Sequence, residues 1–131
     1  INLLNKSVKL KLPALLTISS FLFVGCSAID SRLSLVKNGV MEFCPKATVK
    51  EMVNNYVASP KWSAFVADDG EDYVNIEGEI TYMEKPADIV LQFKVYTDND
   101  TFEVNAFEIN DVPQNIFMQG ALLDNMCSEL N

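Results

Sequence analysis

The sequence predicts an α+β domain: one helix, then a four-stranded antiparallel meander, then a C-terminal helix packed on one sheet face. Two changes of hydrophobic period predict this order. Apolar residues recur at helical spacing over residues 48–58, and they alternate with polar residues over residues 61–109. Helical spacing then returns near the C-terminus. A chain of 131 residues suffices for one domain, which we place at residues 35–131.

The predicted first helix begins at a capping box. Thr48 and Glu51 have the spacing at which both side chains accept hydrogen bonds from N–H groups left free at a helix start. Apolar residues follow at positions 49, 52, 53, 56 and 57, and the Ser-Pro pair at 59–60 ends the run. Before this helix, the turn dipeptide Asn38-Gly39 interrupts short apolar runs, which predicts a small strand pair or an irregular arm over residues 33–43.

The four predicted strands are separated by turn residues at 68–70, 84–86 and 97–100. In the second strand, Asn75, Glu77, Glu79 and Thr81 alternate with apolar residues, so we expect one buried and one wet sheet face. In the fourth strand, the apolar residues change parity, which predicts a β-bulge near Ala106.

We expect the last helix to open at residues 110–113, with a polar cap and Pro113 in its first turn. One apolar stripe then contains Cys127 and a glycine, Gly120, at which we expect close contact between helix and sheet. The stripe consists of Ile116, Phe117, Gly120, Leu123, Cys127 and Leu130.

Composition excludes several kinds of chemistry. The chain contains no histidine, which removes Ser-His and Cys-His nucleophile pairs and the commonest metal ligand. Its formal net charge is -8, which is unsuitable for nucleic acid because phosphate contacts need clustered Lys and Arg. We expect no enzymatic activity, and no sequence pattern indicates a cofactor or a metal site.

Residues 1–25 differ from the rest of the chain. Lys6, Lys9 and Lys11 precede a thirteen-residue stretch without charge, residues 12–24, which is shorter than the roughly 20 residues of a bilayer span. The stretch ends Val24-Gly25-Cys26, which resembles the lipobox of bacterial lipoprotein precursors, although Phe23 stands where leucine is usual. The alternative is an uncleaved anchor or an ordinary signal peptide.

The lipobox resemblance implies that Cys26 is diacylated and that signal peptidase II removes residues 1–25. Two acyl chains give stable anchoring, whereas one gives only marginal membrane binding. Residues 26–34 would then form a lipidated tether, and Ser27 is similar to the residue found in lipoproteins sorted to the outer membrane. The expected location is therefore the bacterial cell envelope, on the outer membrane and facing the periplasm.

Cys44 and Cys127 remain after Cys26 is acylated, and disulfides persist outside the cytoplasm. We therefore predict a bridge between them, the alternative being two buried thiols that do not meet. Seven basic against eighteen acidic residues after residue 25 give a charge of -11. We expect a partner of such a surface to be cationic.

The stretches at 36–39 (Val-Lys-Asn-Gly), 59–62 (Ser-Pro-Lys-Trp), 68–70 (Asp-Asp-Gly) and 102–115 resemble a small extracytoplasmic domain of unassigned function in bacterial hypothetical lipoproteins. The resemblance covers about residues 35–128. It implies a compact helix-sheet-helix domain on membrane-tethered chains and supplies no catalytic residues.

Four groups of polar residues are candidate sites. Glu77 and Glu79 on the wet sheet face, with Gln114 and Asn115 at the N-terminus of the last helix, are candidate partner-binding residues. The carboxylates at 68–72 and 98–100 lack EF-hand spacing and fit turns, with calcium binding as the open alternative.

Two classes of function remain. We favour a non-enzymatic binding or structural lipoprotein with an unknown envelope partner. The alternative is an inhibitor or immunity-type lipoprotein that blocks a cationic enzyme such as a lysozyme, although the known inhibitors of that kind are β-barrels.

Overall fold

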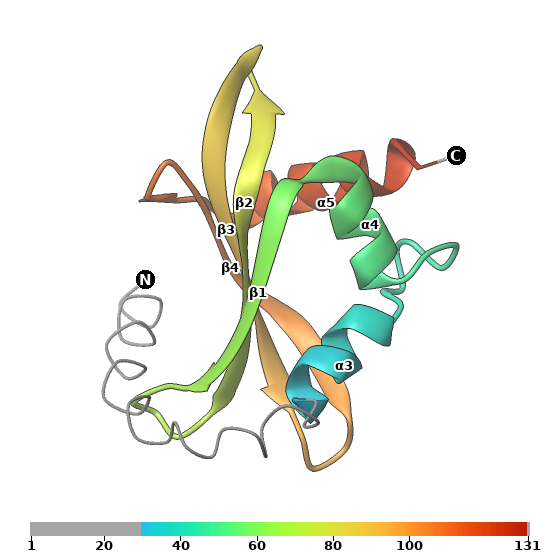
Figure 1. Cartoon of the computed structure of the whole chain (residues 1–131), viewed down its shortest axis with the longest axis vertical. Coiled ribbons are helices and arrows are strands. Elements are labelled where there is room, and N and C mark those ends of the chain that lie inside the picture. Colours follow the sequence, from blue (N-terminus) through green and yellow to red (C-terminus); the bar gives the residue numbers. More distant parts are fainter. Residues whose placement is uncertain (1–29, 131) are drawn as a thin grey trace.

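The computed structural model describes residues 30–130, which form three helices and a five-stranded antiparallel sheet. The strand order is β1-β2-β3-β4-β5, so each strand pairs with the one before it in the chain. All three helices lie on one side of this twisted sheet (Figure 1). We call the opposite side of the sheet, which none of the described helices covers, the open face. The α+β class and the antiparallel meander are thus confirmed.

The predicted number of strands is wrong, because a fifth, two-residue strand follows β4. The elements are α3 (Ser31–Asn38), α4 (Val49–Tyr56), β1 (Ala58–Val66), β2 (Asp72–Tyr82), β3 (Lys85–Tyr96), β4 (Thr101–Ile109), β5 (Val112–Pro113) and α5 (Ile116–Ser128).

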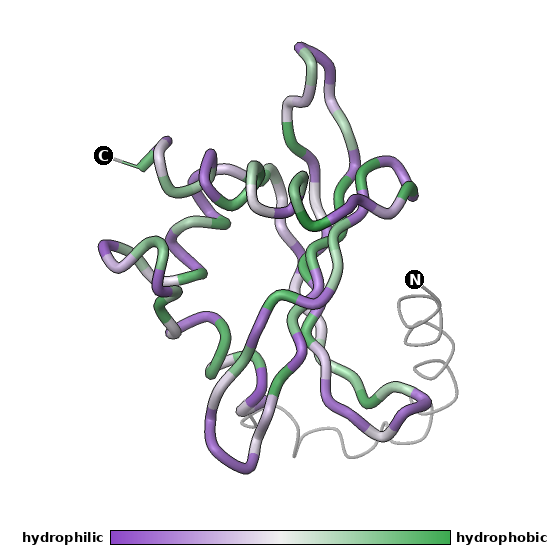
Figure 2. Tube along the Cα trace, turned by 180° about the vertical axis from the view of Figure 1, so that it is seen from behind, coloured by the Kyte–Doolittle hydropathy of each residue, from purple (hydrophilic) through white to green (hydrophobic). Residues whose placement is uncertain are grey.

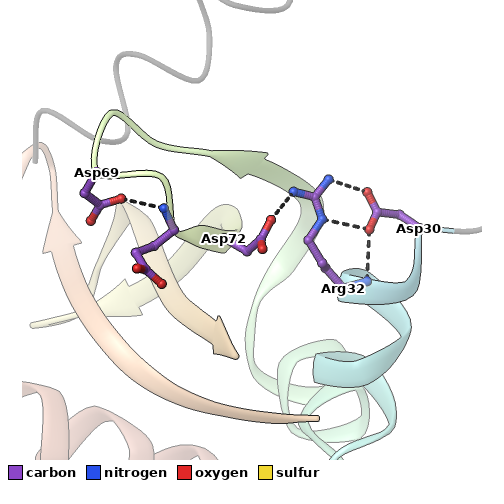
Figure 3. A network of polar contacts seen from close by, with 5 residues as sticks. Asp30, Arg32, Asp69 and Asp72 are labelled. Carbon is purple, nitrogen blue, oxygen red and sulfur yellow. Dashed lines mark hydrogen bonds and ion pairs between the residues drawn. The ribbon is translucent and has the colours of Figure 1, made fainter. Parts of the chain in front are cut away.

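Helix α3 lies where we predicted a strand pair or an irregular arm. Asp30 caps it, its carboxylate accepting from the backbone N–H of Arg32, and Gly39 follows its last residue. The Arg32 guanidinium also bonds to Asp30 and to Asp72 at the start of β2, at 2.8 Å in each ion pair (Figure 3). Residues 31–34, which we assigned to the tether, therefore belong to the folded domain.

Helix α4 begins at the predicted capping box. The Thr48 hydroxyl accepts from the Glu51 N–H at 3.1 Å, and the Glu51 carboxylate accepts from the Thr48 N–H at 2.8 Å. The buried residues Val49, Met52 and Val53 face the sheet side of the molecule and join its main core.

The main core lies between the helices and the sheet. From β2 and β3 it takes the alternate residues Val74, Ile76, Ile80, Ala87, Ile89, Leu91, Phe93 and Val95. Figure 2 shows apolar residues along the middle of the strands and hydrophilic residues at the hairpin turns. A smaller cluster of Phe65, Ala67 and Tyr73 is separate from this core.

The predicted bulge is present in β4. Gln92 pairs with Ala106 and Phe93 with Val104, so Asn105 is the extra residue. The bulge shifts the parity of the strand, so Phe107 and Ile109 face the same side of the sheet as Phe102 and Val104. Phe107 and Ile109 are buried there.

The predicted start of the last helix is wrong. Asn110 and Asp111 have φ values of 49° and 67°, which turn the chain tightly so that Val112 pairs with Ile109. Pro113 thus lies in β5, and α5 starts at Ile116 after the cap residue Asn115.

The predicted apolar stripe of α5 is also partly wrong. Ile116 and Phe117 are 72% and 83% exposed, whereas the buried residues of this helix are Leu122, Leu123 and Met126. Gly120 is exposed, and a Cβ there would meet nothing within 4 Å, so no close helix-sheet contact requires it.

The predicted disulfide between Cys44 and Cys127 is confirmed. The two Cα atoms are 5.8 Å apart, and the bond joins residues separated by 83 positions. It links the segment before α4 to the end of α5, and Cys44 is fully buried. The bond therefore holds together the layer of helices that covers the core.

Candidate functional site

A hollow of about 470 Å³ lies at one end of the sheet, where β1, β2 and β3 meet the turn between β4 and β5. Its ionisable side chains are Glu77, Glu79, Asp88, Asp111 and Lys61. We call this feature the acidic hollow, because its lining carries four carboxylates and one ammonium group. Negative charge is thus concentrated in the concave part of the surface.

The strand register brings these side chains together. Glu79 pairs with Asp88 across β2 and β3, and Glu77 pairs with Lys61 across β1 and β2. The turn residue Asn110 fixes Asp88 through two bonds. The Asp88 N–H donates to the Asn110 side chain at 3.0 Å, and the Asn110 N–H donates to the Asp88 carbonyl at 2.7 Å.

An irregularity in β1 shapes one wall of the hollow. The register shifts between Ala58 and Lys61, and Ser59 has a φ of 51°. Gly78 lies opposite this shift. A Cβ on Gly78 would lie 2.3 Å from a Val57 methyl carbon and 3.0 Å from the Ala58 carbonyl oxygen, so only glycine fits there. The backbone between Glu77 and Glu79 can therefore lie directly against the start of β1.

The charges of the hollow are not compensated by ion pairs. Within residues 30–130 the ion pairs are those of Arg32, and Lys61 forms none with Glu77 despite facing it across the strands. Glu77, Glu79, Asp88 and Asp111 are all exposed. Their carboxylates are therefore available to a cationic ligand.

Glu108 adds a buried carboxyl group next to the hollow. It pairs with Val90, which lines the hollow, and only 5% of its surface is exposed. Its Oε2 atom has no hydrogen-bond partner. Burial raises the pKa of Glu108, and the negative charge of Asp111 raises it further. Sequence analysis did not single out Glu108, which lies between the apolar residues Phe107 and Ile109.

A ladder of amide side chains crosses the open face beside the hollow. The Gln92 amide donates to Asn75 at 3.0 Å, and the Asn105 amide donates to Gln92 at 2.6 Å. Asn75 and Gln92 are each 1% exposed, which corrects our expectation that Asn75 would be wet. These bonds join β2, β3 and the bulge of β4, and they stabilise the sheet that carries the acidic residues.

The candidate partner-binding residues separate into two groups. Glu77 and Glu79 lie on the open face as predicted and line the hollow. Gln114 and Asn115 do not line it. The Gln114 amide donates to the Val112 carbonyl, and the Asn115 side chain caps α5 by accepting from the Met118 N–H. Their polar groups thus have structural partners.

The acidic turn at residues 68–72 does not gather its carboxylates around one point. Asp69 accepts from the Tyr73 hydroxyl at 2.7 Å and from the Glu71 N–H, while Asp72 faces Arg32 (Figure 3). The Tyr73 hydroxyl lowers the pKa of Asp69, and burial together with Asp69 raises the pKa of Tyr73 to about 12. In residues 30–130 no group of three or more Cys, Asp or Glu residues could hold a metal ion.

Two residues of the hollow, Asp88 and Asp111, were missed by sequence analysis. Asp88 follows a predicted turn, and Asp111 was assigned to a helix cap. One sequence signal could have placed Asp88 near Glu79: the length of the hairpin between β2 and β3. Hairpin length sets the strand register, and this register puts Asp88 opposite Glu79.

Cys26, the predicted lipidation site, lies outside the described residues. None of the described helices is long and apolar enough to cross a membrane. No protein-family model, curated protein or solved structure matches this chain.

Proposed function

We propose that this protein is a lipid-anchored lipoprotein of the bacterial envelope whose folded domain binds a cationic protein through the acidic hollow. The anchor would be the acylated Cys26. The observation that carries the binding proposal is the convergence of Glu77, Glu79, Asp88 and Asp111 around one hollow with a single lysine.

Charge distribution supports a protein partner with basic side chains. Residues 30–130 contain all eighteen acidic residues of the chain and seven of its ten basic residues, which gives -11. A surface of this sign steers a cationic partner during diffusional encounter and repels anionic lipid and nucleic acid. A lysine or arginine side chain that enters the hollow would meet several carboxylates, whose hydrogen bonds to a charged donor are stronger than neutral ones.

A non-enzymatic role fits the chemistry of the hollow. Its side chains include no cysteine and no histidine, and the chain contains no histidine at all. The two strand carboxylates, Glu77 and Glu79, lie on the same strand two residues apart, rather than facing each other across a cleft as in glycosidases. We therefore assign these carboxylates to recognition.

The second candidate function is inhibition of a cationic enzyme such as a lysozyme. The same hollow favours it, because a carboxylate-lined depression can hold a basic side chain at the entrance of an enzyme's active site. The five described strands form a sheet that does not close into a barrel, and helices cover one of its faces. The known lysozyme-inhibitor lipoproteins, in contrast, are β-barrels. We therefore rank this function second.

The test compares three forms of the full chain in the capture of proteins from envelope extract. They are the wild type, the variant with Glu77→Lys and Glu79→Lys, and a matched variant with Glu84→Lys and Asp124→Lys. Glu84 and Asp124 are exposed and do not line the hollow, so both variants change the net charge equally. Exposed substitutions of this kind usually alter stability by less than about 0.5 kcal/mol.

We expect the wild type and the matched variant to retain one cationic protein that the Glu77 and Glu79 variant loses. With that protein purified, the Glu77 and Glu79 variant should associate about tenfold more slowly at low salt. Inhibition of a captured enzyme's activity would select the second function. Equal capture by all three forms would contradict the proposal, and equal loss in both variants would assign the effect to net charge alone.

A further inference from the structure

A second hollow, of about 570 Å³, lies on the helix side of the molecule between the segment after α3 and the start of β4. Its apolar lining comes from Leu35, Val40, Met41, Phe43 and Phe102. Val40 and Phe43 are 51% and 41% exposed, which is high for large apolar side chains. We call this feature the apolar hollow.

The wall of the apolar hollow is held in place by several contacts. Gly39 packs so closely on the Phe102 ring that a Cβ would come within 2.3 Å of it. Its carbonyl accepts from the Val49 N–H at 2.9 Å, and the Cys44 N–H donates to the Met41 carbonyl at 3.0 Å. The disulfide of Cys44 then ties the segment to α5. The hollow is therefore preorganised, which lowers the entropic cost of binding.

An unpaired strand edge lies directly beside this hollow. β5 pairs only with Glu108 and Ile109, so residues 101–106 of β4 have no neighbouring strand on their outer side among residues 30–130. Alternate residues of an antiparallel strand turn their N–H and C=O groups toward the same side. Part of the backbone at residues 101–106 is thus available to an added strand.

The two outer edges of the sheet differ in protection. On β1, Pro60 lacks an N–H donor, Lys61 carries a charge, and the register shift between Ala58 and Lys61 distorts the strand. These are the features by which proteins prevent strand addition. Residues 101–104, which precede the bulge at Asn105, contain neither lysine nor proline and pair with β3 in regular register. The β4 edge is the one suited to accept a partner strand.

We infer that the β4 edge binds an extended peptide segment of a partner protein, which adds as a further strand and places apolar side chains in the apolar hollow. Side chains of an added strand alternate between the two sheet faces. Those on the helix side would fill the hollow, whose only charged lining residues are Glu42 and Asp100. Those on the open side would lie beside Glu103, which pairs with Lys94 in register.

Charge complementarity therefore specifies the occupant. The segment should alternate apolar residues with lysine or arginine. A second copy of this chain fits poorly, because each described domain carries -11 and two such domains repel each other. This inference does not depend on the acidic hollow, which lies at a different part of the sheet.

The test uses a fluorescein-labelled heptapeptide of alternating lysine and valine and the full chain in lipid nanodiscs, with binding followed by fluorescence anisotropy. Two further peptides carry N-methyl groups on alternate amides, one on each edge of the extended peptide. Because an added strand uses only one edge, one methylated peptide should bind like the parent and the other should lose binding. A glutamate-valine peptide should not bind.

Protein variants locate the site. Val40→Asp with Phe43→Asp should weaken binding of the lysine-valine peptide about tenfold or more, although it adds negative charge that would strengthen non-specific attraction. Val112→Asp with Phe117→Asp is the matched control, because these exposed apolar residues (57% and 83%) lie outside the hollow and the pair adds the same two charges, and it should bind like the wild type. Circular dichroism melting establishes that both variants fold.

Three outcomes would overturn the inference. Equal binding by both methylated peptides excludes strand addition, and unchanged binding by the Val40 and Phe43 variant excludes the apolar hollow. Concentration-dependent dimerisation in analytical ultracentrifugation, lost with the same variant, would assign the edge to a second copy of the chain. Retained peptide binding in the Glu77→Lys and Glu79→Lys variant would support a site separate from the acidic hollow.

Discussion

Arg32 shows how one side chain fixes the beginning of the folded domain. Its Nε and Nη2 atoms bond to the Asp30 carboxylate at 3.0 and 2.8 Å, and Nη1 bonds to Asp72, forty positions later, at 2.8 Å. The hydrogen bonds from Arg32 lower the pKa of Asp30. The network thus joins the first turn of α3 to the first residue of β2 (Figure 3).

Arg32→Gln should lower the melting temperature at neutral pH by a few degrees, since it removes two partly exposed ion pairs worth about 1 kcal/mol together. A carboxyl group whose folded pKa lies below its unfolded value, about 3.8, stabilises the fold above that value. This stabilisation is lost as the pH falls through the lower, folded pKa. The difference in melting temperature between wild type and variant should therefore shrink progressively as the pH falls below about 3.8. Lys46→Gln, an exposed control, should show no such trend, and a pH-independent difference would contradict the assignment to Asp30.

Two glycines make a matched pair for testing close packing at the acidic hollow. Gly78→Ala should destabilise the protein by about 1 to 3 kcal/mol, because the new methyl group would collide with Val57 and the Ala58 backbone. Gly120→Ala should stabilise it by up to about 1 kcal/mol, because this exposed helical position has open space around it. Thermal unfolding of both variants gives the comparison, and equal effects would show that the Gly78 contact does not restrict the backbone.

At the scale of elements, local signals predicted most of the fold. The capping box of α4, the alternation in β2 and β3 and the parity change in β4 each depend on residues close in sequence, and each is confirmed. Helix α3 was missed because only Val36 of its eight residues is buried, which leaves no clear apolar periodicity. Its Arg32 also pairs with the distant Asp72, a contact that local analysis does not detect.

The end of the sheet shows a competition between two local interpretations. Asn110 and Asp111 suit a helix cap, and they also suit a tight turn with positive φ values. The turn is formed because β4 is paired as far as Ile109, which lets Val112 pair back on it. The same long-range pairing creates the acidic hollow. Glu77 and Glu79 could be predicted from alternation, but Asp88 and Asp111 arrive there through strand register and this turn.

The disulfide acts between elements, and its removal should weaken their association. Cys44→Ala with Cys127→Ala should lower the unfolding free energy by about 2 to 4 kcal/mol, because the long loop closed by the bond becomes free in the unfolded chain. The removal of both thiols avoids an unpaired cysteine. Denaturant melts with and without reductant provide the measurement. Reductant should shift the wild type toward the variant and leave the variant unchanged, and identical stability of both proteins would contradict the expected role.

At the scale of the whole molecule, the two faces of the sheet have different tasks. The helix face carries the main core, the disulfide and the apolar hollow, whereas the open face carries the amide ladder and the acidic residues around the acidic hollow. A domain charge of -11 is repelled by anionic headgroups. In our proposal the acyl chains on Cys26, rather than the folded domain, therefore provide the membrane attachment.

Lipidation is thus the prediction on which the location of the whole molecule depends. Intact-mass analysis of the membrane fraction should show a diacylglyceryl group on a chain that begins at Cys26, because two acyl chains bind a bilayer stably where one does not. Cys26→Ser should abolish the adduct and leave uncleaved precursor or released protein, whereas Ser27→Ala should retain the adduct. Mature protein without the modification in the soluble fraction of wild-type cells would contradict the anchor, and with it the proposed location in the envelope.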